Sequence, residues 1–196
     1  MIPFRLGITG SIGMGKSTTA AYFADQGLPV WDADAAVHRL YASGGAATPA
    51  LAPHFPEAVT PTGIDRAALK SRIATDPAAL ALLESLIHPL VAADRETFLA
   101  HTTADIAVLD IPLLFEKGTE AQLHATLLVT APPALQRARV LARPGMTAAQ
   151  FETLLARQMP DAEKRSRATH IVETLSLDAT RAYVIALIAH IRARHA

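Results

Sequence analysis

Short apolar runs alternate with segments of helical periodicity in the first part of the chain. Residues 4–9 form an apolar run rich in glycine at its end, which is typical of a buried strand. Residues 17–27 show helical spacing, residues 28–31 form a second short strand, and a helix is expected over 35–41. The opening of the chain therefore predicts a β-α-β-α arrangement, which implies a parallel sheet with right-handed crossovers.

The pattern changes in the middle of the chain. Residues 43–63 carry four prolines and three glycines, so we predict a functional loop segment with a short helix of its own. Helical stretches follow over 65–74 and 77–99. We expect a kink or a break in the second stretch at His88-Pro89, because proline lacks an N–H group and clashes with the preceding turn. This region is predicted to be a helical insertion after the second strand.

The α/β pattern then returns. Further strands are predicted over 106–110, 125–130 and 170–172. Helices are predicted from Pro133, near 148–158, and over 177–195. The expected fold class is α/β, with a five-stranded parallel sheet and a helical insertion.

Composition narrows the classes of function. The chain has 18 Lys and Arg against 18 Asp and Glu, so binding to nucleic acid or an anionic membrane by bulk charge is not expected. It has no cysteine, which excludes disulfides, thiolate zinc sites and cysteine nucleophiles. No apolar run approaches the roughly 20 residues that span a bilayer, and no cleavable signal pattern is present. A cytoplasmic protein is expected.

One motif indicates the chemistry. The segment Gly10-Ser11-Ile12-Gly13-Met14-Gly15-Lys16-Ser17 fills every fixed position of the pattern G-x-x-x-x-G-K-[ST], between a predicted strand and a predicted helix. Its glycines allow backbone N–H groups to point at phosphate oxygens. Lys16 places a charge on the β- and γ-phosphates, and Ser17 offers a hydroxyl to Mg²⁺. The segment predicts nucleoside triphosphate binding and a three-layer P-loop NTPase fold.

The absence of asparagine favours a kinase over a GTPase. Guanine-selective proteins commonly use an Asn-Lys-x-Asp loop, which this chain cannot supply. A kinase that acts on a hydroxyl needs a carboxylate to accept or orient the acceptor proton. Asp32 and Asp34 stand at the carboxyl end of the second strand, where ligands bind in such sheets. We favour Asp34 as the catalytic group and Asp32 as a helix cap or supporting carboxylate. His38 would share the helical face of Asp34.

Taken together, several motifs resemble the dephospho-CoA kinase family in order and spacing. They are Gly7-Ile8-Thr9 with the phosphate loop, Asp32-Ala33-Asp34, His88-Pro89-Leu90-Val91 and Pro112-Leu113-Leu114-Phe115-Glu116. The resemblance covers essentially the whole chain. It implies transfer of the ATP γ-phosphoryl group to the ribose 3′-hydroxyl of dephospho-CoA, the last step of coenzyme A synthesis.

The resemblance also implies a division of the chain. A single domain over 1–196 would have a core of about 1–43, 101–142 and 168–196, a helical acceptor-binding insertion of about 44–100, and a lid of about 143–167. The expected ligands are ATP as substrate, Mg²⁺ and dephospho-CoA. No nucleic acid, membrane or obligate protein partner is expected.

Family resemblance assigns roles to individual residues. Asp34 is the expected base, and the nucleotide contacts are Gly10, Ser11, Ile12, Gly13, Met14, Gly15, Lys16, Ser17 and Thr18. The expected acceptor contacts are Asp34, His38, His88, Pro89, Pro112, Leu113, Leu114, Phe115 and Glu116. In this interpretation Pro112 to Phe115 would form an apolar shelf, and Glu116 a polar anchor.

Some of these residues have structural alternatives. Asp110 would hold a magnesium ion through water, or else form the turn before Pro112. The leucines of the shelf could belong to the ordinary core. His88 could be a buried histidine with its hydrogen bonds satisfied.

The arginines define the expected lid. Arg137, Arg139 and Arg143 lie at about one-turn spacing. A closing arginine stabilises the charge on the transferred phosphoryl group. The resemblance favours Arg139 and Arg143 as catalytic residues, with Gln158 and Arg165 further along the lid. The alternative is a solvated helix face.

The last predicted strand departs from the family pattern. Related sequences usually carry an Ala-Asp pair entering this strand and an Asn leaving it. Here residues 168–174 read Ala-Thr-His-Ile-Val-Glu-Thr. Thr174 or a backbone group would have to replace the asparagine at the adenine end.

Two other functions are compatible with the sequence. The first is another small-molecule kinase, acting on a nucleoside monophosphate or a sugar acid. A phosphate acceptor calls for several arginines, and residues 35–99 offer Arg39, Arg66, Arg72 and Arg95. The second is a nucleotide-dependent binding module without an acceptor.

Overall fold

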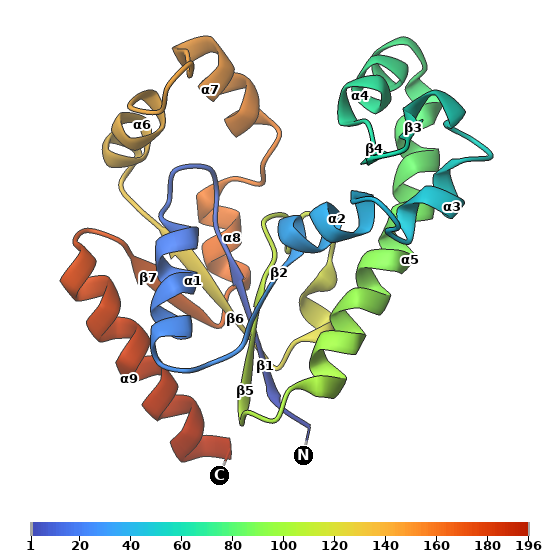
Figure 1. The fold of residues 1–196 in the computed structure, drawn as a ribbon. Helices are drawn as coiled ribbons and strands as arrows, with labels where there is room; N and C mark the ends of the chain where they lie inside the picture. The colour runs from blue at the N-terminus through green and yellow to red at the C-terminus, as the bar shows by residue number, and fades with distance from the viewer. Residues whose placement is uncertain (1, 196) are drawn as a thin grey trace. The chain divides into compact units, whose positions relative to one another are not determined.

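Five strands form the central sheet of the computed structural model, which describes residues 2–195 (Figure 1). Their order is β2-β5-β1-β6-β7, and β1 pairs in parallel with β5 and with β6, as β6 does with β7. The strands are β1 (Phe4–Thr9), β2 (Val30–Asp32), β5 (Ile106–Asp110), β6 (Ala125–Thr130) and β7 (His170–Glu173). The predicted α/β fold with a five-stranded parallel sheet is confirmed.

The strand order places a ligand crevice at the end of β1. Strands β2 and β5 lie on one side of β1, and β6 and β7 lie on the other. Ligands of open α/β sheets bind beyond the carboxyl ends of the strands, where the strand order reverses. The phosphate loop follows β1 directly, so it stands at this reversal point.

The helices of the sheet-containing unit are α1 (Lys16–Asp25), α6 (Pro133–Leu141), α7 (Ala148–Ala156), α8 (Asp161–Arg167), α9 (Leu177–His195) and the 3₁₀ helix η2 (Thr119–Gln122). Figure 1 shows α1 and α9 side by side along the sheet. Phe23 of α1 and Ile188 of α9 join Leu6, Val108 and Leu127 of the strands in one buried apolar cluster. Burial of these side chains is the main stabilising contribution to this layer.

Residues Asp32–His101 form a second compact unit, and the sheet-containing unit comprises the chain up to Trp31 and from Thr102 onward. The elements of the second unit are α2 (Ala33–Tyr41), α3 (Ala47–Leu51), η1 (Pro56–Ala58), β3 (Val59–Thr60), β4 (Gly63–Ile64), α4 (Arg66–Thr75) and α5 (Pro77–His101). The unit has its own apolar cluster, which includes Leu40, Leu51, Phe55 and Leu69. Helix α2 packs on α3 and α5, so it belongs with the insertion rather than with the sheet. The division into core, insertion and lid stays a prediction.

Helix α5 continues through the position where a kink or a break is expected. It runs from Pro77 to His101, with Pro89 inside it. Pro89 and Ser85 are both exposed, so water can satisfy the carbonyl that loses its helical partner. Among the helices of residues 2–195, α5 is also long and apolar enough, by length and composition alone, to cross a membrane. A single helix of this kind is weak evidence for a membrane segment, because core helices pass the same test.

Candidate active site

The phosphate loop connects β1 to α1 in a conformation that requires glycine. Gly13 and Gly15 have φ angles of 77° and 93°, in the left-handed region. A Cβ atom on Gly13 would lie 2.4 Å from Val140 Cγ2, and one on Gly10 would lie 2.5 Å from the carbonyl oxygen of Val129. These glycines therefore allow both the curl of the loop and its close approach to β6 and α6.

Side chains from outside the loop fix its backbone. The buried Gln136 side chain donates from Nε2 to the carbonyl oxygen of Ile12, at 2.8 Å. The Ile12 N–H in turn donates to Gln158 Oε1, at 3.1 Å. The family resemblance points to Gln158, but nothing in the sequence points to Gln136. Gln136 lies inside an ordinary helical pattern, which gives no signal of its contact with Ile12.

Thr174 joins the phosphate loop to Arg139. Its buried hydroxyl donates to the carbonyl oxygen of Met14, at 2.8 Å. Arg139 donates from Nη1 to the same hydroxyl at 2.8 Å and from Nη2 to the Thr174 carbonyl at 2.6 Å. Thr174 is the residue that we expect to replace the asparagine of the family pattern, and it uses both its side chain and its backbone. It therefore holds the Arg139 guanidinium beside the loop.

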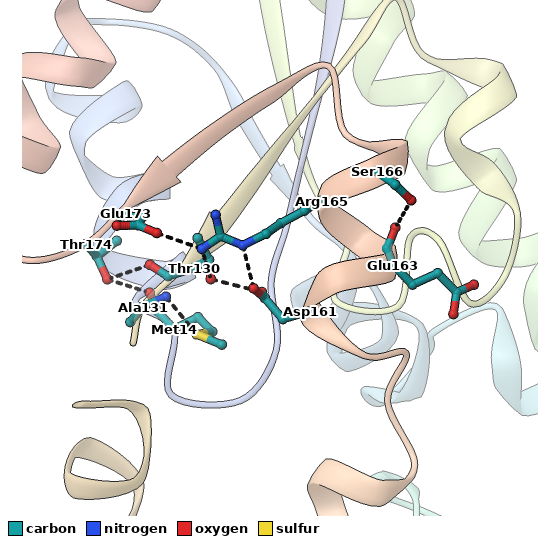
Figure 2. A network of polar contacts seen from close by, with 9 residues as sticks. All are labelled: Met14, Thr130, Ala131, Asp161, Glu163, Arg165, Ser166, Glu173 and Thr174. Atoms are coloured by element: carbon teal, nitrogen blue, oxygen red, sulfur yellow. Dashed lines mark hydrogen bonds and ion pairs between the residues drawn. The ribbon is translucent and has the colours of Figure 1, made fainter. Parts of the chain in front are cut away.

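A polar network links α8 to the ends of β6 and β7 (Figure 2). Thr130 donates its hydroxyl hydrogen to Asp161 Oδ1, at 2.9 Å. Arg165 donates to Asp161 at 2.7 Å and to Glu173 at 2.7 Å. Two carboxylates thus compensate the charge of Arg165. We conclude that Arg165 organises the base of the predicted lid in this structure, rather than standing as an uncompensated cation.

Lys16 and Asp110 form an ion pair between the phosphate loop and the end of β5. Asp110 is 3% exposed and lies opposite Ile8 in the register of β1 and β5. The ion pair shows that Asp110 does more than form the turn before Pro112. A carboxylate and the neighbouring Ser17 hydroxyl are hard oxygen donors, which fit Mg²⁺ when phosphates and waters complete its shell.

A cavity of about 190 Å³ opens beside the loop. It is lined by Gly13, Gly15, Thr18, Arg139, Arg143, Thr174, Ser176, Leu177 and Thr180. The two arginines predicted for the lid therefore meet the glycines of the loop at one cavity. Arg143 is exposed, whereas Arg139 is half-buried.

The structure buries two of the four residues of the predicted apolar shelf after β5. Leu114 and Phe115 are 0% and 2% exposed. A Cβ atom on Gly7 would lie 2.8 Å from Leu114 Cδ1, and the Phe115 ring lies under the Arg167 guanidinium, at 5.2 Å from the ring centre. These two residues pack in the interior, which fits the alternative of an ordinary core. Pro112 is partly buried and Leu113 is 38% exposed, and the role of the shelf in binding the acceptor stays a prediction.

Glu116 is held by a buried lysine. Its Oε1 atom lies 2.8 Å from Nζ of Lys164, whose side chain is 0% exposed, and accepts a hydrogen bond from the Met159 N–H at 3.0 Å. Burial alone raises the pKa of Glu116, but the ammonium group of Lys164 and the N–H of Met159 bring it below its ordinary value. Glu116 therefore ties this segment to α8, and its predicted role as an acceptor anchor stays untested. A lysine within the charged run of α8 gives no sequence signal of burial.

In the second unit, the neighbouring carboxylates of Asp32 and Asp34 have different environments. Asp32 accepts a hydrogen bond from the Ala35 N–H at 2.9 Å and caps α2. Asp34 lies in the first turn of α2 and is exposed. His88 and Pro89 are exposed on α5, so His88 is not a buried histidine. The catalytic role of Asp34 stays a prediction, whereas Asp32 has the capping geometry.

The sheet, the loop at its reversal point and the helical insertion define the class of P-loop kinases. The family model of dephospho-CoA kinase matches residues 4–178. A dephospho-CoA kinase from Cereibacter sphaeroides is 69% identical over 192 residues, covering 98% of each chain. One from Ruegeria pomeroyi is 55% identical over 190 residues, covering 97% of this chain and 96% of the relative. The chain belongs to the dephospho-CoA kinase family.

Solved structures agree with this fold. A protein from Thermus thermophilus is 41% identical, with a TM-score of 0.84 and coverage of 97% of this chain and 98% of the other. A dephospho-CoA kinase from Campylobacter jejuni is 22% identical, with a TM-score of 0.67 and the same coverage. At this identity, the second likeness supports the fold alone.

Proposed function

We propose that the protein transfers the γ-phosphoryl group of ATP to the ribose 3′-hydroxyl of dephospho-CoA, which gives coenzyme A and ADP. The observation that carries this proposal is an intact phosphate loop in a chain 69% identical to a dephospho-CoA kinase over 98% of its length. In this reaction the 3′-oxygen forms a bond to the γ-phosphorus. The bond from that phosphorus to the β–γ bridging oxygen breaks, and ADP leaves.

We propose Asp34 as the group that accepts or orients the proton of the 3′-hydroxyl. Its carboxylate is exposed in the first turn of α2. Asp32 already satisfies the capping requirement of this helix, so Asp34 is available for another role. General bases of this kind contribute typically about 10²- to 10⁴-fold to the rate.

Mg²⁺ would be held by the Ser17 hydroxyl and the Asp110 carboxylate. The ion would neutralise charge on the β- and γ-phosphates. Lys16 would bind the same phosphates, since its ammonium group already lies at the end of β5 beside Asp110. Backbone N–H groups of the loop supply the remaining contacts to phosphate oxygens.

The cavity beside the loop is proposed to take part of the bound nucleotide. Arg139 and Arg143 line it together with Thr174 and Leu177. Arg139 is oriented by Thr174, whereas Arg143 lies at the turn between α6 and α7. We propose that Arg143 stabilises the charge of the transferred group when this segment closes.

Arg143→Ala is expected to lower kcat and to change the KM for ATP much less. An arginine that closes over the transferred phosphoryl group binds it most tightly in the transition state. The measurement is steady-state kinetics with ATP varied at saturating dephospho-CoA. Arg137→Ala is the control, since Arg137 already pairs with Glu152. An unchanged kcat in the Arg143 variant would transfer the role to Arg139.

Thr174→Val is expected to raise the KM for ATP about tenfold, because a lost buried hydrogen bond costs roughly 1 to 3 kcal/mol. The valine has the same shape but no hydroxyl for Met14 and Arg139. Thr126→Val is the matched control, since it removes a buried hydroxyl at the start of β6, away from the loop. If both variants lose stability equally and keep their KM for ATP, then Thr174 has only a packing role.

The proposed activity is tested by ADP release with dephospho-CoA, AMP, CMP, shikimate and gluconate offered one at a time as acceptor. We expect turnover to be strong with dephospho-CoA. Turnover with one of the other four alone contradicts the proposal. ADP release that is independent of any acceptor would indicate a nucleotide-dependent binding module instead.

We also propose that the protein acts in the cytoplasm, without nucleic acid, membrane or an obligate protein partner. The support is a formal net charge of zero and small-molecule substrates that require no macromolecule. Recovery of activity in the pelleted membrane fraction of lysed cells would contradict this placement.

A further inference from the structure

The arginines of the Asp32–His101 unit differ in their partners. Three of the four pair with carboxylates, so their charges are compensated within the unit. These pairs are Arg39–Asp94, Arg72–Asp76 and Arg95–Glu96, with N–O distances of 2.6, 3.2 and 3.3 Å. The fourth arginine, Arg66, has different partners.

Arg66 contacts two rings and no carboxylate among the described residues. Its Nη1 atom lies 3.3 Å from His38 Nε2, and its guanidinium carbon lies 5.4 Å from the ring centre of Tyr41. Arginine can only donate hydrogen bonds, and an imidazole ring supplies no negative charge. Burial raises the pKa of Tyr41, although the charge of Arg66 opposes this, so the phenol supplies no negative charge either. The charge of Arg66 is therefore oriented but not neutralised.

The position of Arg66 does not stabilise the helix that carries it. Arg66 is the first residue of α4, directly after the capping residue Asp65. A positive side chain in the first turn of a helix opposes the helix dipole. The side chain is also exposed. A contribution to the stability of α4 therefore does not account for an arginine at this position.

Arg66 of α4 contacts the face of α2 on which the proposed base Asp34 lies. Asp34 and His38 are four residues apart on α2, so they share a face and are separated by about one turn, ~6 Å. Arg66 contacts the second of them. The exposed guanidinium of Arg66 thus contacts the residue that lies one helical turn from the exposed Asp34 carboxylate, in the same unit.

We propose that Arg66, oriented by His38 and Tyr41, binds the 5′-diphosphate of the acceptor while Asp34 faces its 3′-hydroxyl. The proposal rests on the proposed function, because it takes Asp34 as the group that faces this hydroxyl. In dephospho-CoA the two groups belong to one ribose and are only a few bonds apart, so one small site can contact both. The planar guanidinium matches two phosphate oxygens at once. Arg66 thereby selects acceptors that carry a diphosphate beside the reacting alcohol.

The first test compares Arg66→Met with Arg72→Met, two substitutions on the same exposed helix. Arg66→Met is expected to raise the KM for dephospho-CoA by about 10- to 100-fold, the scale of a lost charge-assisted contact, with the KM for ATP unchanged. Arg72→Met leaves both constants near wild type. Arg66→Lys keeps the positive charge but loses the paired N–H donors of the guanidinium, so an intermediate KM for dephospho-CoA is expected. Equal KM values in the Arg66 and Arg72 variants would overturn the proposal.

A truncated acceptor separates diphosphate binding from a general effect on folding. Adenosine carries the 3′-hydroxyl but no diphosphate. Its low kcat/KM is expected to be the same in wild type and in Arg66→Met. If Arg66→Met lowers turnover of adenosine and dephospho-CoA by the same factor, Arg66 has only a structural role and the proposal is wrong.

Calorimetric binding distinguishes this inference from the proposed function. Dephospho-CoA is titrated into the full chain without ATP, so that no turnover is needed. Weaker binding to Arg66→Met than to Arg72→Met supports the inference even if the wild type phosphorylates another acceptor. Equal binding to both variants contradicts it even if the wild type phosphorylates dephospho-CoA.

Discussion

Asp34→Asn is expected to lower kcat by at least about 10²-fold, the scale of a general base, and to leave ATP affinity nearly unchanged. The amide keeps the size of the side chain but cannot accept the acceptor proton. Asp34 is exposed and belongs to the Asp32–His101 unit, whereas the phosphate loop belongs to the sheet-containing unit. The measurement is single-turnover phosphoryl transfer beside equilibrium binding of ATP.

Asp32→Ala is the control for this substitution. Asp32 caps α2, so its loss is expected to lower the free energy of unfolding by about 1 kcal/mol. The Asp34 variant is expected to keep the thermal stability of the wild type. If Asp34→Asn keeps near-normal turnover, Asp34 is not the base and the proposed mechanism fails.

Lys16→Ala is expected to weaken ATP binding and to lower kcat as well, because Lys16 would contact the phosphates both before and during transfer. We expect a combined loss in kcat/KM of at least about 10²-fold. The same substitution removes the lysine of the ion pair with the buried Asp110 carboxylate, so the free energy of unfolding is expected to fall as well. Kinetics and thermal unfolding are measured on the same preparation.

The double variant Lys16→Ala with Asp110→Asn separates these two effects. Asparagine removes the buried charge, so the double variant is expected to recover part of the lost stability without recovering activity. Recovery of ATP binding together with stability would show that Lys16 acts on folding rather than on phosphate.

The phosphate loop and the strands could be predicted because their signals are local. Left-handed φ angles at Gly13 and Gly15 require glycine, and a lysine follows at a fixed position. Each buried strand is a short apolar run, as the fully buried stretch of β5 shows. These features depend on neighbouring residues in the chain, so the sequence alone reveals them.

The remaining features depend on partners distant in sequence. Lys164 is buried only because Glu116, far earlier in the chain, provides its counter-charge. Leu114 and Phe115 carry a family motif, yet the motif does not say which side of the segment faces the interior. Pro89 ends a helix in most contexts, but here the exposed backbone tolerates it.

Gln136 shows the same limit within the site, and Thr174 shows it in part, because the departure from the family pattern indicates its position but not its contacts. Each contacts the phosphate loop across more than a hundred residues of chain. Polar residues at such positions look like ordinary helix or strand-end residues. Only the folded chain brings them to the backbone of the loop.

The ion pair between Lys16 and Asp110 has a consequence for which anions the resting protein admits. Free inorganic phosphate that binds Lys16 takes the lysine away from the buried Asp110 carboxylate, which opposes its binding. A polyphosphate that arrives with its own divalent cation offers each member of the pair a replacement counterion at once. We therefore expect the ion pair to favour the metal-complexed nucleotide over a simple anion at this loop.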